Sequence, residues 1–206
     1  MSKYKFYIGV DPGITGSIAI LDKGKMSVYR MPVKSIIVNK KKKNKYDIQE
    51  IVKLLKPYYG KNVLFAQEAV SVMPGQGNLS GFNFGVSAGL TIGAAVALGF
   101  EIVEVRPSKW KKVYPELSSS DKLKSQIKKL KQNDKTIKDK VLKKANKREI
   151  EKLGRQIKTE AKNAARALVS KLYPKLKDEF KLKRDDGKAE AVLICLWGKN
   201  YYKEKT

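Results

Sequence analysis

Apolar and polar residues alternate at the start of the chain, in the pattern of a half-buried strand. Every second residue across positions 4–10 is apolar. Apolar runs follow at 17–21 and 26–31, and the sequence KGK at 23–25 provides a turn between them. This pattern predicts a three-stranded meander within the first 32 residues.

The next part of the chain switches between helical and strand patterns. Asp47 precedes a short segment with helical spacing of apolar residues, so we expect a capped helix there. A short apolar strand at 62–66 ends in Gln67-Glu68, and an apolar helix at 79–98 and a strand at 101–105 follow. Three strands, then helix, strand, helix and strand, predict a mixed α/β sheet.

Residues 118–157 differ from the rest of the chain. Apolar residues recur there at helical spacing in two arms, with a bend near Asn133-Asp134, and most other positions are lysine. We interpret this segment as a basic helical hairpin inserted in one domain that spans residues 1–206. We expect a third helix at about 159–172, and a last, strongly apolar helix after a polar linker near Asp178-Glu179.

The charge of the chain limits the kinds of partner that we expect. It has 45 Lys and Arg against 20 Asp and Glu, a net charge of +25. Such a charge repels itself and favours a polyanionic partner, nucleic acid before an anionic membrane surface. Residues 34–45 hold six lysines and no acid, which predicts a loop that is solvated or faces DNA. The longest low-charge stretch, 86–100, is too short and too rich in Gly and Ala to span a membrane, and we expect no secretory signal.

The chain has one cysteine, Cys195, and no histidine. This excludes an internal disulfide, most cysteine-rich metal sites, imidazole ligands, and catalysis by Ser-His-Asp or Cys-His groups. We expect an intracellular, reducing compartment. Hydrolytic chemistry would depend on carboxylates, lysines and metal-bound water.

Four acids adjoin apolar segments, where a solvated charge does not usually lie. Asp11 ends the first strand and Glu68 the fourth, so they emerge at the same edge if these strands are parallel neighbours. Asp186 and Glu190, four apart at the start of the last helix, share a face, whereas Asp185 would lie well round the helix. Gathered carboxylates repel one another unless cations bind among them, and oxygen-only ligands favour Mg²⁺ or Mn²⁺ over zinc. Two such ions about 4 Å apart can activate water and stabilise the leaving oxygen of a phosphodiester.

Each acid also has a purely structural interpretation. Asp11 could serve only an Asp-Pro-Gly turn, Glu68 could pair with a lysine, and Asp186 could be only an N-cap. The four together, on a basic chain without histidine, favour the shared metal site.

Five stretches cover most of the chain outside the lysine-rich segment: GVDPGITGSIAIL, QEAVSVMPGQGNLSGFNFGVSAGLTIGAAVALG, VRPSKWKK, KTEAKNAARALVSKLYP and DDGKAEAVLICLWG. They resemble the RuvC-type Holliday-junction resolvases of the RNase H-like superfamily, nearer to the phage, viral and plastid branch than to the cellular bacterial one. The resemblance implies an RNase H-like fold, with a mixed five-stranded sheet flanked by helices. It also implies an endonuclease that cuts four-way DNA junctions by paired nicks as a homodimer. A virus- or phage-encoded protein is compatible with it, but the sequence leaves the source open.

The resemblance further implies that Asp11, Glu68, Asp186 and Glu190 hold two Mg²⁺ ions, for which Mn²⁺ could substitute. The bacterial enzymes place the last two acids three apart; the spacing of four found here is similar to the viral and plastid pattern. Lys111 and Lys162 match lysines near the scissile phosphate, where they would neutralise charge that develops in the transition state. The residues expected to contact DNA are Gly75, Gln76, Gly77, Phe82, Lys109, Lys112 and Arg166.

Glycine recurs every fourth residue in the helix expected at 79–98, and costs about 1 kcal/mol per helix position relative to alanine. These residues are Gly81, Gly85, Gly89 and Gly93. They indicate a close backbone approach, either to the chain's own sheet or to the same helix of a second copy. Phe82 or Phe84 could wedge against an unstacked base or lie in the core, and we expect Trp110 and Trp197 in the core.

Three other functions compete with a resolvase. An actin-like ATPase would use DPGITG as a phosphate loop, but it needs a second, similar half that this chain does not show. A non-catalytic RNase H-like module would bind DNA without cutting it. A nuclease for flaps, forks or RNA hybrids would keep the same site and differ only in the shape of its groove.

Overall fold

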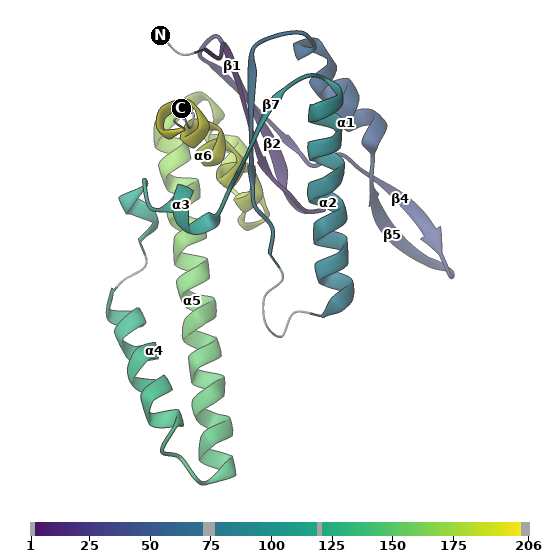
Figure 1. Cartoon of the computed structure of the whole chain (residues 1–206). Helices are drawn as coiled ribbons and strands as arrows, with labels where there is room; N and C mark the ends of the chain where they lie inside the picture. Colours follow the sequence, from purple (N-terminus) through teal and green to yellow (C-terminus); the bar gives the residue numbers. More distant parts are fainter. Residues whose placement is uncertain (1–2, 72–76, 119–120, 203–206) are drawn as a thin grey trace.

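The computed structural model describes residues 3–71, 77–118 and 121–202 (Figure 1). Its main feature is a five-stranded sheet with the strand order β3-β2-β1-β6-β7. Strands β1, β2 and β3 form an antiparallel meander, while β6 and β7 run parallel to β1. The bounds are β1 Phe6–Asp11, β2 Ser17–Asp22, β3 Lys25–Arg30, β6 Val63–Glu68 and β7 Glu101–Val105. The predicted α/β class and mixed five-stranded sheet are therefore confirmed.

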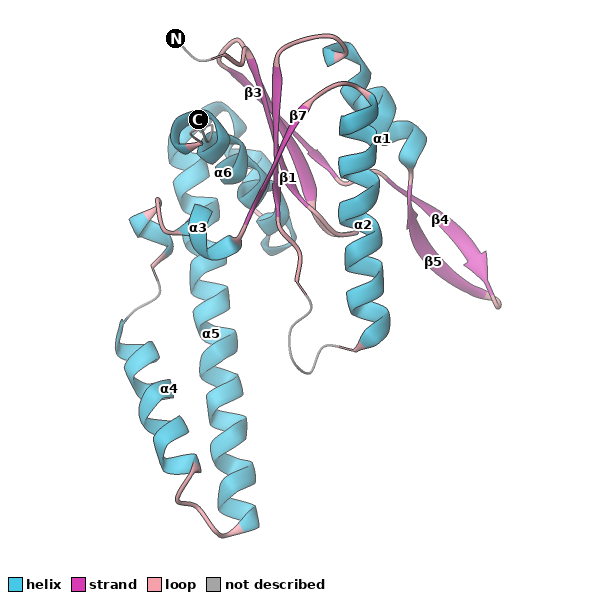
Figure 2. Ribbon diagram, viewed as in Figure 1, coloured by secondary structure: helices cyan, strands magenta, loops and turns pink. Residues whose placement is uncertain are grey.

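Helices cover both faces of this sheet (Figure 2). Helices α1 (Ile48–Leu55) and α2 (Asn78–Ala97) lie on one face, and α5 (Lys140–Leu172) and α6 (Asp186–Tyr201) on the other. Alternation along β1 supplies both cores, because Ile8 points to the α1–α2 side and Tyr7 to the α6 side. Gly9 allows α6 to pack directly on β1, since a Cβ there would overlap the α6 backbone at Ala191.

A second, two-stranded sheet corrects the prediction for residues 34–45, which are not a loop. Strand β4 (Val33–Val38) pairs with β5 (Lys41–Tyr46) as a hairpin that projects from the body (Figure 2). Asn39 and Lys40 form its turn with φ values of 51° and 59°, the left-handed conformation that a tight two-residue hairpin turn needs. Buried Tyr46 anchors its base. Residues 33–38 contain β-branched residues typical of a strand, but the many lysines of this segment indicated a loop.

The lysine-rich segment forms two antiparallel helices. Helix α4 (Asp121–Asp134) packs along the first half of α5, where Leu123 and Leu153 are buried and the Asn146 side chain donates to the Leu130 carbonyl and to Asp134. Helix α5 then continues without a break, so the separate third helix expected at 159–172 is wrong. No proline interrupts residues 140–172, so the backbone hydrogen bonds of the helix continue through them. The boundaries of an inserted segment at 118–157 stay a prediction.

Short segments complete the chain before the last helix. Helix α3 (Pro107–Lys111) follows β7, and the expected polar linker near 178–179 is instead a 3₁₀ segment, Pro174–Phe180, which buries Phe180 in the core. Helix α6 is apolar nearly all round because the sheet and α5 enclose it. In the described ranges 3–71, 77–118 and 121–202, no helix combines the length and hydropathy that a membrane span requires.

Candidate active site

Asp11 and Glu68 lie side by side at one edge of the sheet. Strands β1 and β6 are parallel neighbours, and their register pairs Val10 with Gln67, so each strand ends in its acid at the same level. The condition for a shared edge, that the strands ending in Asp11 and Glu68 are parallel neighbours, is thus met.

The N-terminus of α6 crosses this edge beside Asp11. A Cβ at Gly187 would lie 2.8 Å from the Thr15 carbonyl oxygen and 2.9 Å from Asp11 Oδ2, so only glycine fits there without a shift of its neighbours. Asp186 is the first residue of α6, and Glu190 lies one turn further along. This close packing brings acidic side chains from β1, β6 and α6 to one place.

The charges of three of these acids influence one another's pKa values. Burial raises the pKa of Asp11 well above its ordinary value, and the charges of Glu190 and Glu68 raise it further, while Lys111 and Lys162 lower it. Burial also raises the pKa of Glu68, against the lowering effect of a hydrogen bond from Trp110 and of the Lys111 charge. Asp11, Glu68 and Glu190 therefore act on one another as a cluster of repelling charges.

Lys111 supplies positive charge within this cluster. Its Nζ lies 2.8 Å from Glu190 Oε1 and 4.9 Å from the centroid of the Trp110 ring, a cation–π contact. Burial alone would lower the pKa of Lys111, but Glu190, Glu68 and Asp11 raise it above the ordinary lysine value. The lysine is therefore held in its charged form by the three acids.

Asp186 faces α5 and not the other acids. Its Oδ2 lies 3.3 Å from Lys162 Nζ, and its Oδ1 lies 3.0 Å from Arg166 Nε, in an ion pair without hydrogen-bond alignment. It is not the N-cap of α6, a position that Asp185 occupies. The structure therefore places Asp186 beside the cluster, with two cations of α5 as its partners.

Asp185 has a different, structural role. It is buried, pairs with Arg30, and accepts a hydrogen bond of 2.9 Å from the Leu182 backbone N–H. Its carboxylate therefore holds the turn before α6 against β3; the choice of Asp186 over Asp185 as a metal ligand stays a prediction.

A cleft of about 380 Å³ opens over this edge of the sheet. Asp11, Asp186 and Glu190 contribute acidic groups to its lining. Four cations also line it: Arg30, Lys162, Lys183 and Arg184. These four cations are exposed, whereas the three acids are less exposed, so the cations form a basic rim around the acids. Such a rim suits a phosphodiester, whose negative charge it attracts.

The oxygen-only donors fit the chemistry of a hard divalent cation such as Mg²⁺ or Mn²⁺. As the side chains lie, however, no group of three or more acidic or cysteine side chains in the described part of the chain is close enough to share an ion. Metal binding would require Asp11, Glu68 and Glu190 to draw together, and Glu190 to exchange its contact with Lys111 for the ion.

The residues expected to contact DNA are only partly described. Gly75 and Gln76 lie outside the described residues, and Gly77 precedes α2 as its exposed N-cap residue. Phe82 is 68% exposed, whereas Phe84 is partly buried and packs near Gly13. The other three are Lys109 and Lys112, which are exposed, and Arg166, which pairs with Asp186.

Trp110 is the site residue that sequence reasoning missed. Both Trp110 and Trp197 are buried, as predicted, but the Trp110 indole also donates to Glu68 Oε2 at 2.7 Å. The available signal was its position next to Lys111 in the WKK stretch. Ser87 was missed as well: its hydroxyl accepts a 2.8 Å hydrogen bond from the Gly13 N–H and ties the loop after Asp11 to α2.

Neither a protein-family model nor a curated protein sequence matches this chain. Two solved structures of RuvC from Thermus thermophilus resemble part of it. The one in complex with a Holliday junction substrate is 13% identical over 54% of this chain and 71% of that chain, with a TM-score of 0.38. The other is 15% identical over 52% of this chain and 67% of that chain, with a TM-score of 0.33. Similarity at this level carries no argument about activity, so the function is inferred from the site itself.

Proposed function

We propose that this protein is a metal-dependent endonuclease that cuts branched DNA, and specifically a RuvC-type resolvase of four-way junctions from the phage, viral and plastid branch. The observation that carries the proposal is the meeting of Asp11, Glu68 and Glu190 from β1, β6 and α6 at one edge of the sheet, beside Lys111. Repelling buried acids cost stability in the absence of a cation, and a protein with a net charge of +25 has little structural need for them.

The roles of the side chains follow from their positions. Asp11, Glu68 and Glu190 would hold Mg²⁺, with Asp186 as a fourth ligand once a cation competes with Lys162 and Arg166. Magnesium bound there would supply the positive charge that polarises water and the scissile phosphate. A cation at Glu190 would free Lys111, whose ammonium then lies near the developing negative charge, and Lys162 would act in the same way from the rim of the cleft.

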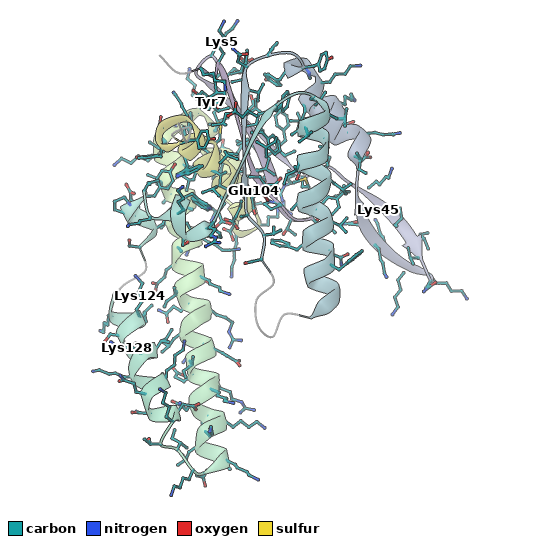
Figure 3. The ribbon with its side chains drawn as sticks, viewed as in Figure 1. Lys5, Tyr7, Lys45, Glu104, Lys124 and Lys128 are labelled. Atoms are coloured by element: carbon teal, nitrogen blue, oxygen red, sulfur yellow. The ribbon has the colours of Figure 1, made fainter. Side chains whose placement is uncertain are left out.

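The surface around the cleft supports DNA as the substrate. Beyond the cationic rim, the β4–β5 hairpin places Lys34 directly opposite Lys45, which Figure 3 labels. Like charges at paired positions destabilise a hairpin, and a two-stranded sheet has little stability to lose. A polyanion bound along the hairpin would remove this repulsion.

The outer face of α2 supports a homodimer. Phe82, Val86 and Val96 are exposed along it, at 68%, 39% and 58%. A Cβ at Gly85, Gly89 or Gly93 would meet nothing within 4 Å. Packing against the chain's own sheet therefore does not explain these glycines, and the same face of a second copy would bury them.

The dimer has its own test. Gly89→Leu would insert a large side chain into the proposed interface but meets open space in the single chain. We expect sedimentation equilibrium to give a dimer for the wild type and a monomer for this variant, with an unchanged circular dichroism spectrum. A wild-type monomer at all concentrations would contradict the dimer.

The activity is tested with a synthetic four-way junction whose four strands are labelled separately. With Mg²⁺ we expect paired nicks in two opposing strands, and none with EDTA. Asp11→Asn and Glu68→Gln should abolish the nicks, whereas Asp185→Asn, one residue from the site acid Asp186, should retain them. Equal cutting of single-stranded DNA would refute the resolvase but leave a nuclease, and binding without any cutting would favour a non-catalytic module.

A further inference from the structure

A stripe of cations runs along one side of α5. This helix has 33 residues, a length of roughly 50 Å at 1.5 Å per residue. At about 100° per residue, five exposed cations fall within about 40° of Lys162 around the helix axis. These five, called the α5 stripe below, are Lys140, Lys144, Arg148, Arg155 and Lys158.

The stripe starts at the candidate active site and faces away from α4. Lys162, in line with it, lines the cleft and pairs with Asp186. On the opposite side of the helix, Leu153 is buried against α4 and Asn146 reaches the Leu130 carbonyl. Figure 1 accordingly shows α5 extending from the sheet edge near α6, with α4 covering one flank. The stripe is therefore continuous with the cleft and open to a ligand.

The cations of the stripe have no ion-pair partner among the described residues. In the described part of the chain, none of the five forms an ion pair, although α5 has a Lys152–Glu149 pair elsewhere on its surface. Lys140, Lys144 and Arg148 follow one another at intervals of four residues, a spacing at which like charges destabilise a helix. Glu151 is the one acid near the middle of this face. The arrangement favours an extended polyanion over a compact anionic ligand.

The length of the stripe matches DNA. From Lys162 to Lys140 the helix rises by about 33 Å, which corresponds to one turn, or about 10 base pairs, of B-form duplex. We propose that the α5 stripe binds the phosphate backbone of one duplex arm, over the helical turn of DNA next to the scissile phosphate. This inference rests on the proposed nuclease function and assigns the path of its substrate.

The test compares two variants of the full-length protein that lose equal charge. The stripe variant changes Lys140, Lys144, Arg148, Arg155 and Lys158 to Gln. The control variant changes five exposed lysines of α4 and the turn after it to Gln: Lys122, Lys128, Lys129, Lys131 and Lys135. Lys128 lies on the part of α4 that faces away from α5 (Figure 3). Glutamine is a good helix former, and circular dichroism verifies that both variants are folded.

Binding is measured by fluorescence anisotropy over a range of salt, on junctions with 15-base-pair arms and on junctions with 6-base-pair arms closed by hairpin loops. Loss of five phosphate contacts should make the slope of log K against log salt shallower by about 4.5 on the long arms. On the short arms, which span about 20 Å and reach only Lys158 and Arg155, it should become shallower by about 2. The control variant should keep the wild-type slope on both.

Two results would overturn the inference. An unchanged slope for the stripe variant on the long arms would show that the stripe does not bind DNA, and would favour an acidic protein partner. An equal change of slope in the control variant would show that the effect comes from net charge and not from the stripe. Cleavage of the short-armed junction separates the two proposals. If the wild type cuts it and the stripe variant shows no slope change, only the path of the DNA is wrong; if the wild type neither binds nor cuts any junction, the nuclease function fails as well.

Discussion

The hydrogen bond from Trp110 to Glu68 can be tested without any assumption about activity. Trp110→Phe keeps an aromatic ring in the core but removes the indole N–H that lies 2.7 Å from Glu68 Oε2. A hydrogen bond to a charged group contributes about 1.5 to 3 kcal/mol, and this one favours the ionised carboxylate because it lowers the pKa of Glu68. Trp110→Phe should therefore cost more stability when Glu68 is ionised than when it is protonated.

The loss of stability caused by Trp110→Phe should increase with pH. Burial raises the pKa of Glu68, so at about pH 4 the carboxyl is largely protonated and the substitution costs only lost packing. At about pH 8 the ionised group has lost its donor, and the loss in free energy of unfolding should be larger by about 1.5 to 3 kcal/mol. Urea unfolding followed by circular dichroism at a series of pH values measures the difference.

Trp197→Phe is the matched control. Trp197 is also buried, at 2% exposure, and loses the same atoms, but its indole has no carboxylate partner in the described residues. Its cost should be the same at both pH values. If the two variants show the same pH dependence, the Trp110–Glu68 hydrogen bond does not support the ionised acid, and our account of the cluster's electrostatics is wrong.

Three further predictions concern the same edge of the sheet. Gly187→Ala would place a Cβ 2.8 Å from the Thr15 carbonyl oxygen, so we expect a loss of about 1 to 3 kcal/mol by urea unfolding and loss of junction incision; an unchanged unfolding midpoint would contradict the close packing. Asp185→Asn weakens the contacts to Arg30 and to the Leu182 N–H and should cost about 1 to 3 kcal/mol while the folded enzyme still cuts; loss of incision under conditions where it is folded would place Asp185 in the site. Because burial and neighbouring acids raise the pKa of Asp11, protons should compete with the metal there, so the acid limb of incision should move to lower pH as Mg²⁺ is raised; an acid limb that does not depend on Mg²⁺ would contradict this.

The sequence predicted those parts of the site that depend on strand order. Asp11 and Glu68 each follow a continuous apolar strand, and parallel strands bring their carboxyl ends to one edge. The helical spacing of Asp186 and Glu190 likewise placed them on successive turns of α6. These are local patterns whose consequences follow from the geometry of regular secondary structure.

Contacts between distant segments could not be predicted in the same way. Asp186 faces Lys162 and Arg166 because α5 packs beside α6, and nothing in the spacing of either helix indicates that packing. The Trp110–Glu68 hydrogen bond joins residues 42 positions apart for the same reason. Tertiary packing thus gave Asp186 a different set of neighbours from the one its sequence spacing indicated.

Two secondary-structure errors have local causes. In the β4–β5 hairpin, the many lysines indicated a solvated loop. The β-branched residues Ile36, Ile37 and Val38, and the Asn39-Lys40 turn with its positive φ values, instead favour a strand hairpin. In α5 the change from a lysine-rich to an alanine-rich composition near residue 159 gave the impression of two helices. Composition changes along a helix without any change in its backbone.

Calorimetric titration of the protein with Mn²⁺, and then with Mg²⁺, tests the central claim most directly. The account predicts that the wild type binds a divalent cation, and that proton release on binding increases as the pH is lowered toward the raised pKa of Asp11, because metal and proton compete for that carboxylate. Asp11→Asn and Glu68→Gln should each weaken binding at least about tenfold, a loss of about 1.4 kcal/mol, while Asp185→Asn leaves it unchanged. Equal affinity in all four proteins, or no binding by the wild type at millimolar metal, would contradict a shared metal site at this edge of the sheet.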